Sequence, residues 1–149
     1  MDAFSVRTKI MIGGGMDALA QRLHRVFLVT DKFMAESGKT NYVTDRLLRS
    51  GGEFKIFSDV QADPDIATVT RGVEQILEFQ PDAVVAFGGG SAIDAAKAIV
   101  FFAARERDMR DCKFIAIPTT SGTGSEVSRF AVITDQEKGV KYPLVGDSL

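Results

Sequence analysis

Hydrophobic segments of two different lengths and spacings alternate along the first 118 residues of the chain. The short apolar runs, which are typical of buried strands, are residues 25–30, 54–57, 83–87 and 114–117. Longer segments with helical spacing lie between them, at residues 33–50, 63–77 and 91–104. Strands that alternate with helices predict βαβ units, and therefore an α/β fold built on a doubly wound parallel sheet with right-handed crossovers.

Turn and capping residues predict where these helices begin and end. Gly51-Gly52 closes the first helical segment, and Gly38 disfavours a helix over its first half. Asp63-Pro64 combines a capping side chain with a proline suited to the first helical position, so it is expected to open the second helix. The third helix is expected to begin at Ser91, and Asp94 three residues later completes the pattern of a capping pair.

The last 20 residues depart from this alternation. Apolar segments at 130–133 and 140–145 flank a polar stretch that contains Gly139, a pattern that predicts a β-hairpin. The chain then ends at Leu149 with neither a terminal helix nor a polar tail. We therefore expect residues 1–149 to be one domain, the N-terminal fragment of a larger protein.

Composition excludes several classes of protein. The longest uninterrupted apolar run, residues 98–104, has seven residues, whereas a membrane-spanning helix needs about 20. Eighteen basic and twenty acidic side chains give a net charge of −2, which disfavours a nucleic-acid-binding surface. The single cysteine, Cys112, cannot form an internal disulfide, and the N-terminus lacks the pattern of a signal peptide. We expect a cytoplasmic protein that binds neither membranes nor nucleic acid.

The strongest local signal is a glycine turn between the third apolar run and the helix that follows it. Three glycines, Gly88 to Gly90, let the backbone approach a ligand closely, and the N–H groups at the start of a helix favour an anion. These features predict a pyrophosphate site, although a tight turn before a capped helix has the same spacing. The turn is not a Walker loop, because no Gly-Lys-Ser/Thr follows it.

A second glycine cluster competes for the same role. Residues 13–18 fit the dinucleotide pattern G-x-G-x-x-A, they follow a possible strand at Lys9–Ile12, and Asp31 lies 18 residues beyond Gly13. The intervening helix, over about residues 16–24, is short for a crossover. A plain glycine turn is therefore the favoured interpretation of residues 13–15.

Two further segments carry candidate chemistry. Asp31 ends an apolar strand, where its carboxylate could accept hydrogen bonds from both ribose hydroxyls of an adenosine and repel a 2′-phosphate, or could simply cap the next helix. The loop at residues 118–126 contains five hydroxyl side chains and two glycines directly after a predicted strand. This composition and position favour a ligand-binding loop over a neutral linker.

The motifs at residues 88–97, 117–126 and 132–135 together resemble those of the iron-containing (group III) alcohol dehydrogenases. The similarity runs through essentially the whole chain, which corresponds to the family's N-terminal, Rossmann-like nucleotide-binding domain, and the ending at Lys138–Leu144 is similar to that of 1-propanol dehydrogenases. The resemblance implies NAD as cofactor. It implies that Gly89, Gly90 and Ser91 hold the pyrophosphate with Asp94 close by, that Asp31 binds the ribose, that Thr119, Thr120 and Thr123 line the cofactor, and that Val132 and Lys141 complete its nicotinamide-side wall.

The same resemblance implies what this chain lacks. The family's divalent metal, iron or zinc, is held by an aspartate and three histidines of a helical domain that is absent here, so no catalytic residue and no metal site is assigned to this chain. We expect the full-length parent to be a homo-oligomer that acts on a small primary alcohol or aldehyde, and the chain alone to be inactive. Two alternatives stay open: a non-catalytic nucleotide-binding module, and a relative of glycerol dehydrogenase or dehydroquinate synthase.

Overall fold

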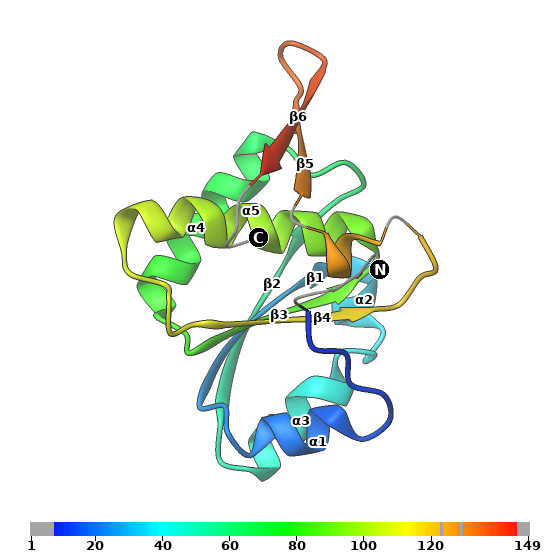
Figure 1. The fold of residues 1–149 in the computed structure, drawn as a ribbon, viewed down its shortest axis with the longest axis vertical. Coiled ribbons are helices and arrows are strands. Elements are labelled where there is room, and N and C mark those ends of the chain that lie inside the picture. The colour runs from blue at the N-terminus through cyan, green and yellow to red at the C-terminus, as the bar shows by residue number, and fades with distance from the viewer. Residues whose placement is uncertain (1–7, 123, 129, 146–149) are drawn as a thin grey trace, which may run out of the picture.

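A four-stranded parallel sheet forms the centre of the molecule (Figure 1). The computed structural model describes residues 8–122, 124–128 and 130–145. The strands of this sheet are β1 (Arg25–Asp31), β2 (Glu53–Val60), β3 (Ala83–Gly88) and β4 (Lys113–Pro118). They lie in the order β2-β1-β3-β4. The predicted doubly wound α/β fold is confirmed, because all three strand pairs are parallel and helices cover both faces.

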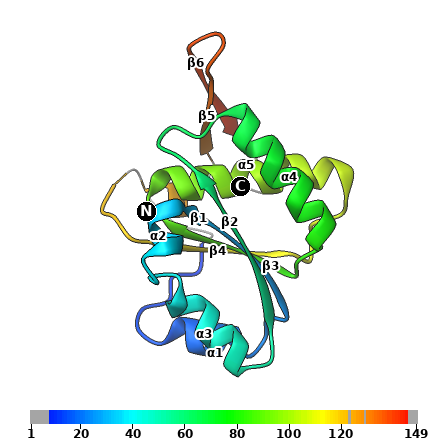
Figure 2. The same ribbon diagram turned by 180° about the vertical axis from the view of Figure 1, so that it is seen from behind.

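Alternate residues of the central strands contribute to two separate hydrophobic cores. Phe27 and Val29 of β1 pack with α4 (Ile66–Phe79) and α5 (Gly90–Glu106), whereas Val26 and Leu28 pack with α1 (Gly15–Ala20) and α3 (Asn41–Arg49). Figure 2 shows α1 and α3 together at one end of the molecule and α4 and α5 towards the other. Every residue of β3 is buried, as expected for a strand covered on both faces.

The helical segment predicted at residues 33–50 is divided in two. It forms α2 (Lys32–Glu36) and α3 (Asn41–Arg49), and Gly38 lies between them with φ of +78°. A residue with a side chain rarely adopts that backbone conformation, so the glycine permits the break. Gly38 was expected to disfavour a helix over the first half of the segment, but α2 forms there and the helical segment breaks at Gly38.

The predicted start of α4 is wrong by two residues. The N-cap is Asp65, whose carboxylate accepts a hydrogen bond from the backbone N–H of Thr68 at 2.7 Å. Asp63 instead has φ of +54° and forms an ion pair with Lys141 at 3.0 Å. Both aspartates precede the helix, and only the backbone geometry decides which of them caps it.

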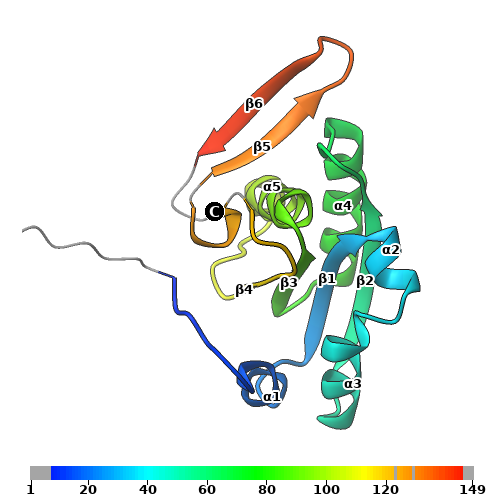
Figure 3. The same ribbon diagram turned by 90° about the vertical axis from the view of Figure 1, so that its right-hand side faces the viewer.

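A two-stranded antiparallel hairpin follows the sheet, as predicted. It consists of β5 (Phe130–Asp135) and β6 (Val140–Val145), and Gly139 adopts φ of +63° in the turn. Figure 3 shows it reaching past α5, on the side of the molecule away from α1. Ala131 and Ile133 are buried, and the N–H of Thr134 donates to the carbonyl of Pro64 at 3.0 Å. The hairpin is therefore attached to the helical layer of α4 and α5.

Candidate functional site

The carboxyl ends of β1, β3 and β4 meet at one edge of the sheet. Gly88 pairs with Pro118 across β3 and β4, and Val29 pairs with Ala86 two residues before the end of β1. The chain leaves β1 towards β2 and leaves β3 towards β4, so the strand order reverses between β1 and β3. Ligands of open α/β sheets bind outside the carboxyl ends of the strands at such a switch point.

Asp31 lies at this switch point with its two carboxylate oxygens in different surroundings. Oδ1 accepts a hydrogen bond from the N–H of Met34 at 2.8 Å and so caps α2. Oδ2 lies 3.8 Å from the position that a Cβ on Gly88 would occupy. The helix-capping interpretation is therefore confirmed, and it leaves the second oxygen directed towards the glycine turn.

The backbone of the glycine turn favours glycine at residue 88, and the space at residue 89 is narrow. Gly88 has φ of +148°, and a Cβ there would lie 3.0 Å from the Cβ of Ala92. A Cβ on Gly89 would lie 3.2 Å from the hydroxyl oxygen of Thr120. The loop after β4 thus approaches the turn so closely that a side chain at residue 89 would compete with Thr120 for space.

Helix α5 begins at this turn without a side-chain cap. Its N-cap is Gly89 and Ser91 is already the second helical residue, so the predicted capping pair of Ser91 and Asp94 is wrong. The backbone N–H groups of the first helical turn have no earlier carbonyl to bind within the helix. Together with the helix dipole, they form the arrangement that binds phosphate groups at helix N-termini.

Two residues of the loop after β4 contact the turn. The backbone N–H of Thr119 donates to the carbonyl of Gly88 at 2.9 Å, and the side chain of Thr120 lies against Gly89. Both threonines are exposed. Thr123, the third threonine expected to line a cofactor, lies outside the described residues.

Asp94 joins α5 to the hairpin. Its Oδ2 accepts a hydrogen bond from the N–H of Val132 at 3.3 Å, so the structure brings these two predicted site residues together. Among the described residues, its buried Oδ1 has no hydrogen-bond partner. Burial raises the pKa of Asp94, opposed by hydrogen bonds from Ser125 and Val132 and by the charge of Lys97.

Lys141 occupies a different position from the other predicted site residues. Its ammonium is paired with Asp63 in the segment before α4, and both side chains are exposed. A role for Lys141 in the wall of a cofactor site therefore stays a prediction.

The glycine cluster at residues 13–15 lacks the context of a dinucleotide fingerprint. The strand expected at Lys9–Ile12 is wrong: these residues are exposed and belong to no strand. The helix that follows, α1, has six residues and packs against α3. Gly13 has φ of +75°, in agreement with a plain glycine turn.

One residue without an assigned role is built into the same region. Lys97 of α5 is 2% exposed, and its ammonium donates hydrogen bonds to the backbone carbonyls of Ser125 and Ser128. Ser125 is the first residue of η1 (Ser125–Val127), the short 3-10 helix in the loop after β4, and Ser128 directly follows it. A lysine inside an otherwise apolar helix was the sequence signal for this contact, since such a side chain is rarely buried without partners.

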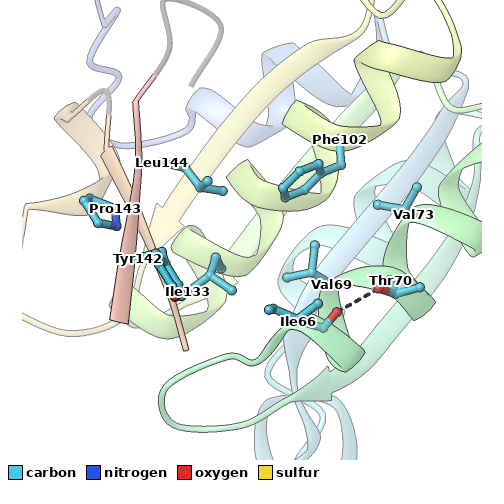
Figure 4. A pocket seen from close by; sticks show the side chains of 9 residues that line it. All are labelled: Ile66, Val69, Thr70, Val73, Phe102, Ile133, Tyr142, Pro143 and Leu144. Carbon is cyan, nitrogen blue, oxygen red and sulfur yellow. Dashed lines mark hydrogen bonds between the residues drawn. The ribbon is translucent and has the colours of Figure 1, made fainter. Parts of the chain in front are cut away.

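An apolar cavity lies away from the glycine turn. It has a volume of about 530 Å³ and opens between α4, α5 and the hairpin (Figure 4). Its lining side chains are Ile66, Val69, Thr70, Val73, Phe102, Ile133, Tyr142, Pro143 and Leu144. The Thr70 hydroxyl is already bonded to the carbonyl of Ile66 at 2.9 Å. The cavity therefore offers mainly apolar surface and few groups for acid–base chemistry.

The described residues do not form a metal site. Across residues 8–122, 124–128 and 130–145, no three His, Cys, Asp or Glu side chains lie close enough together to hold an ion. No helix in this part of the chain combines the length and the hydrophobicity that a membrane span requires.

Comparison with known proteins identifies relatives across nearly the whole chain. The family model of the iron-containing alcohol dehydrogenases matches residues 8–149. The 1-propanol dehydrogenase PduQ of Citrobacter freundii is 43% identical over 151 residues, which cover 100% of this chain and 40% of that protein. The NADPH-dependent butanol dehydrogenase of Clostridium saccharobutylicum is 42% identical over 125 residues, which cover 74% of this chain and 32% of the relative.

A solved structure shares both the fold and part of the sequence. The sulfoacetaldehyde reductase of Bifidobacterium kashiwanohense, crystallised in complex with NAD⁺, is 32% identical with a TM-score of 0.82, over 99% of this chain and 44% of that protein. The chain spans 40% of the length of the 1-propanol dehydrogenases PduQ that it matches. The resemblance read from the glycine and threonine motifs is confirmed.

Proposed function

Because the chain belongs to the iron-containing alcohol dehydrogenase family, we propose that it is the NAD-binding portion of a dehydrogenase acting on small primary alcohols or aldehydes. Residues 1–149 form the dinucleotide-binding domain of that enzyme. The observation that carries the proposal is the convergence of Asp31, the glycine turn and Thr119–Thr120 at the switch point of the sheet.

The residues at this edge suit the parts of a dinucleotide in order. In this proposal the N–H groups of Gly89, Gly90 and Ser91, at the start of α5, would bind the pyrophosphate. Oδ2 of Asp31, which faces the glycine turn, would accept hydrogen bonds from the adenosine ribose hydroxyls. Thr119 and Thr120 line the cofactor beside the turn. NAD supplies the nicotinamide ring that accepts or returns a hydride, while the protein binds and orients it.

The rest of the reaction requires groups that the described residues do not contain. They hold no cluster suited to iron or zinc, and in this proposal another part of the full-length enzyme would hold the metal. The substrate alcohol or aldehyde would meet the cofactor there, and the full-length enzyme would assemble as a homo-oligomer. By itself the chain would bind NAD without turnover.

The choice between NAD and NADP tests the role of Asp31. A 2′-phosphate beside this carboxylate would face a like charge, and a repulsion of about 2 kcal/mol would give roughly thirtyfold preference for NAD. We therefore expect titration of the full-length protein to show tighter binding of NAD than of NADP. Asp31→Gly should remove most of this difference, because it removes the carboxylate. The helix should keep its stability, since glycine preserves a helix N-cap to within a few tenths of a kcal/mol.

Asp65→Gly is the matched control, since it removes the N-cap aspartate of α4 and leaves the nucleotide edge untouched. It should retain the wild-type preference. Equal affinity of the unmutated protein for both cofactors would show that Asp31 acts only as a helix cap. Failure of the unmutated protein to bind either cofactor would contradict the proposed function itself.

A further inference from the structure

The loop between β4 and β5 is anchored to the glycine-turn unit at two points. At its beginning, the N–H of Thr119 donates to the carbonyl of Gly88 at 2.9 Å. At its end, the carbonyls of Ser125 and Ser128 accept hydrogen bonds from the ammonium of Lys97. Lys97 lies on α5, whose N-terminus is the glycine turn, so both anchors lead back to the same β3–α5 unit.

The chemistry of the second anchor is specific to lysine. An ammonium group has three N–H donors, and the structure offers three oxygens: the two carbonyls, and the Ser128 hydroxyl at 3.3 Å. Backbone carbonyls directed into a buried site need a donor, because a buried acceptor left without one is destabilising. A side chain without donors at position 97 would leave these carbonyls unsatisfied.

The charge of Lys97 is balanced locally. Burial lowers the pKa of Lys97, while the carboxylates of Asp94 and Glu126 raise it. Asp94 lies one turn earlier on α5 and itself holds β5 through Val132. Two successive turns of α5 thus hold the segment at residues 125–128 and the start of the hairpin.

We propose that Lys97 is a positioning residue of the nucleotide site: by holding the segment at residues 125–128, it keeps Thr119 and Thr120 seated against the glycine turn. This inference rests on the proposed function, because the loop matters only if the turn binds a nucleotide. Lys97 itself would not touch the cofactor. It acts through the loop whose other end packs on Gly88 and Gly89.

The test uses Lys97→Met in the full-length protein, which keeps the length of the side chain and removes its donors. We expect the Kd for NAD, measured at a temperature where the variant is folded, to rise at least tenfold. Amide hydrogen exchange at Val127, whose N–H bonds to the carbonyl of Gly124, should become faster. Lys138→Met, the same substitution at an exposed position in the hairpin turn, should change neither quantity.

The outcomes separate the two proposals. If the wild type binds NAD and Lys97→Met binds it equally well despite a lower melting temperature, Lys97 is merely structural and the inference is overturned. If the wild type does not bind NAD, the proposed function fails. Amide exchange at Val127 then tests only whether Lys97 anchors residues 125–128: faster exchange in Lys97→Met supports this anchoring, and an unchanged rate overturns it.

A second variant covers the case in which Lys97→Met does not fold. Lys97→Gln retains two N–H donors without the charge, and its Kd for NAD should rise by at least threefold. A wild-type Kd for this variant would overturn the inference.

Discussion

The contact between α4 and α5 places Gly72 directly against Ile99, and a Gly72→Ala variant tests the packing that holds α5 in place. A Cβ added to Gly72 would lie 2.2 Å from Cδ1 and 2.6 Å from Cγ1 of Ile99. Restoring a contact of 3.4 Å would require Cδ1 to move by about 1.2 Å. Ile99 is 0% exposed and belongs to the same core as Phe57, so it has little space into which to move.

Two opposing effects set the magnitude. Alanine is favoured over glycine inside a helix by about 1 kcal/mol. Forcing an extra methyl group into a well-packed core costs about 1–3 kcal/mol. Because the nearer contact is far below the normal range and involves a fully buried side chain, we expect overpacking to win. The predicted net loss is about 1–2 kcal/mol in the free energy of unfolding.

Urea unfolding of the purified variants measures this balance. Glu74 is exposed on the same helix, so comparing Glu74→Ala with Glu74→Gly gives the propensity contribution without the clash. Ile99→Ala removes both atoms that Gly72→Ala would meet, at a cost of about 2–5 kcal/mol. In the Ile99→Ala background, Gly72→Ala should become neutral or stabilising. The two substitutions would then show a favourable coupling energy of about 2 kcal/mol in the double-mutant cycle.

The reasoning would be refuted by a Gly72→Ala variant at least as stable as the wild type. It would also be refuted if Gly72→Ala lowered the free energy of unfolding by the same amount whether residue 99 is isoleucine or alanine. Either result would mean that α4 and α5 separate easily, and that the position of α5 does not depend on this contact.

Two other predictions concern a cap and a thiol. Asp65→Ala should destabilise the protein by about 1 kcal/mol at neutral pH, because it removes the acceptor for the N–H of Thr68. The hydrogen bonds with Thr68 lower the pKa of Asp65 below 3.8, so this stabilisation is present above that pH and lost as the pH falls below it. Urea curves of variant and wild type should therefore converge as the pH falls below 3.8, and a gap that stays constant would contradict the cap. Burial raises the pKa of Cys112 from 9.0 to about 11. Its reaction with a disulfide reagent at about pH 8 should therefore be about a hundredfold slower than that of an unhindered peptide thiol. Reaction at the rate of the peptide thiol would show that the Cys112 thiol is not desolvated.

Features that depend on nearest neighbours along the chain were predictable from the sequence. The unbroken apolar run at residues 83–87 indicated a strand buried on both faces, and β3 is buried throughout. Gly139 indicated the hairpin turn, and Gly38 marked a weak point of the helical segment at residues 33–50. Propensity, periodicity and glycine's access to positive φ are local properties, so the sequence alone indicated the four strands of the sheet, the helices between them and their order. The strand expected at Lys9–Ile12 does not form. The glycine and threonine motifs likewise indicated the family.

Features that depend on contacts between distant residues were decided only by the tertiary structure. The sequence predicted Asp63 as the cap of α4, whereas the fold assigns the cap to Asp65 and pairs Asp63 with Lys141, 78 residues away. The partners of Lys97 lie 28 and 31 residues further along the chain. A side chain of this kind can cap, pair or bind a ligand, and the choice depends on which groups the packed sheet and helices bring within hydrogen-bond distance.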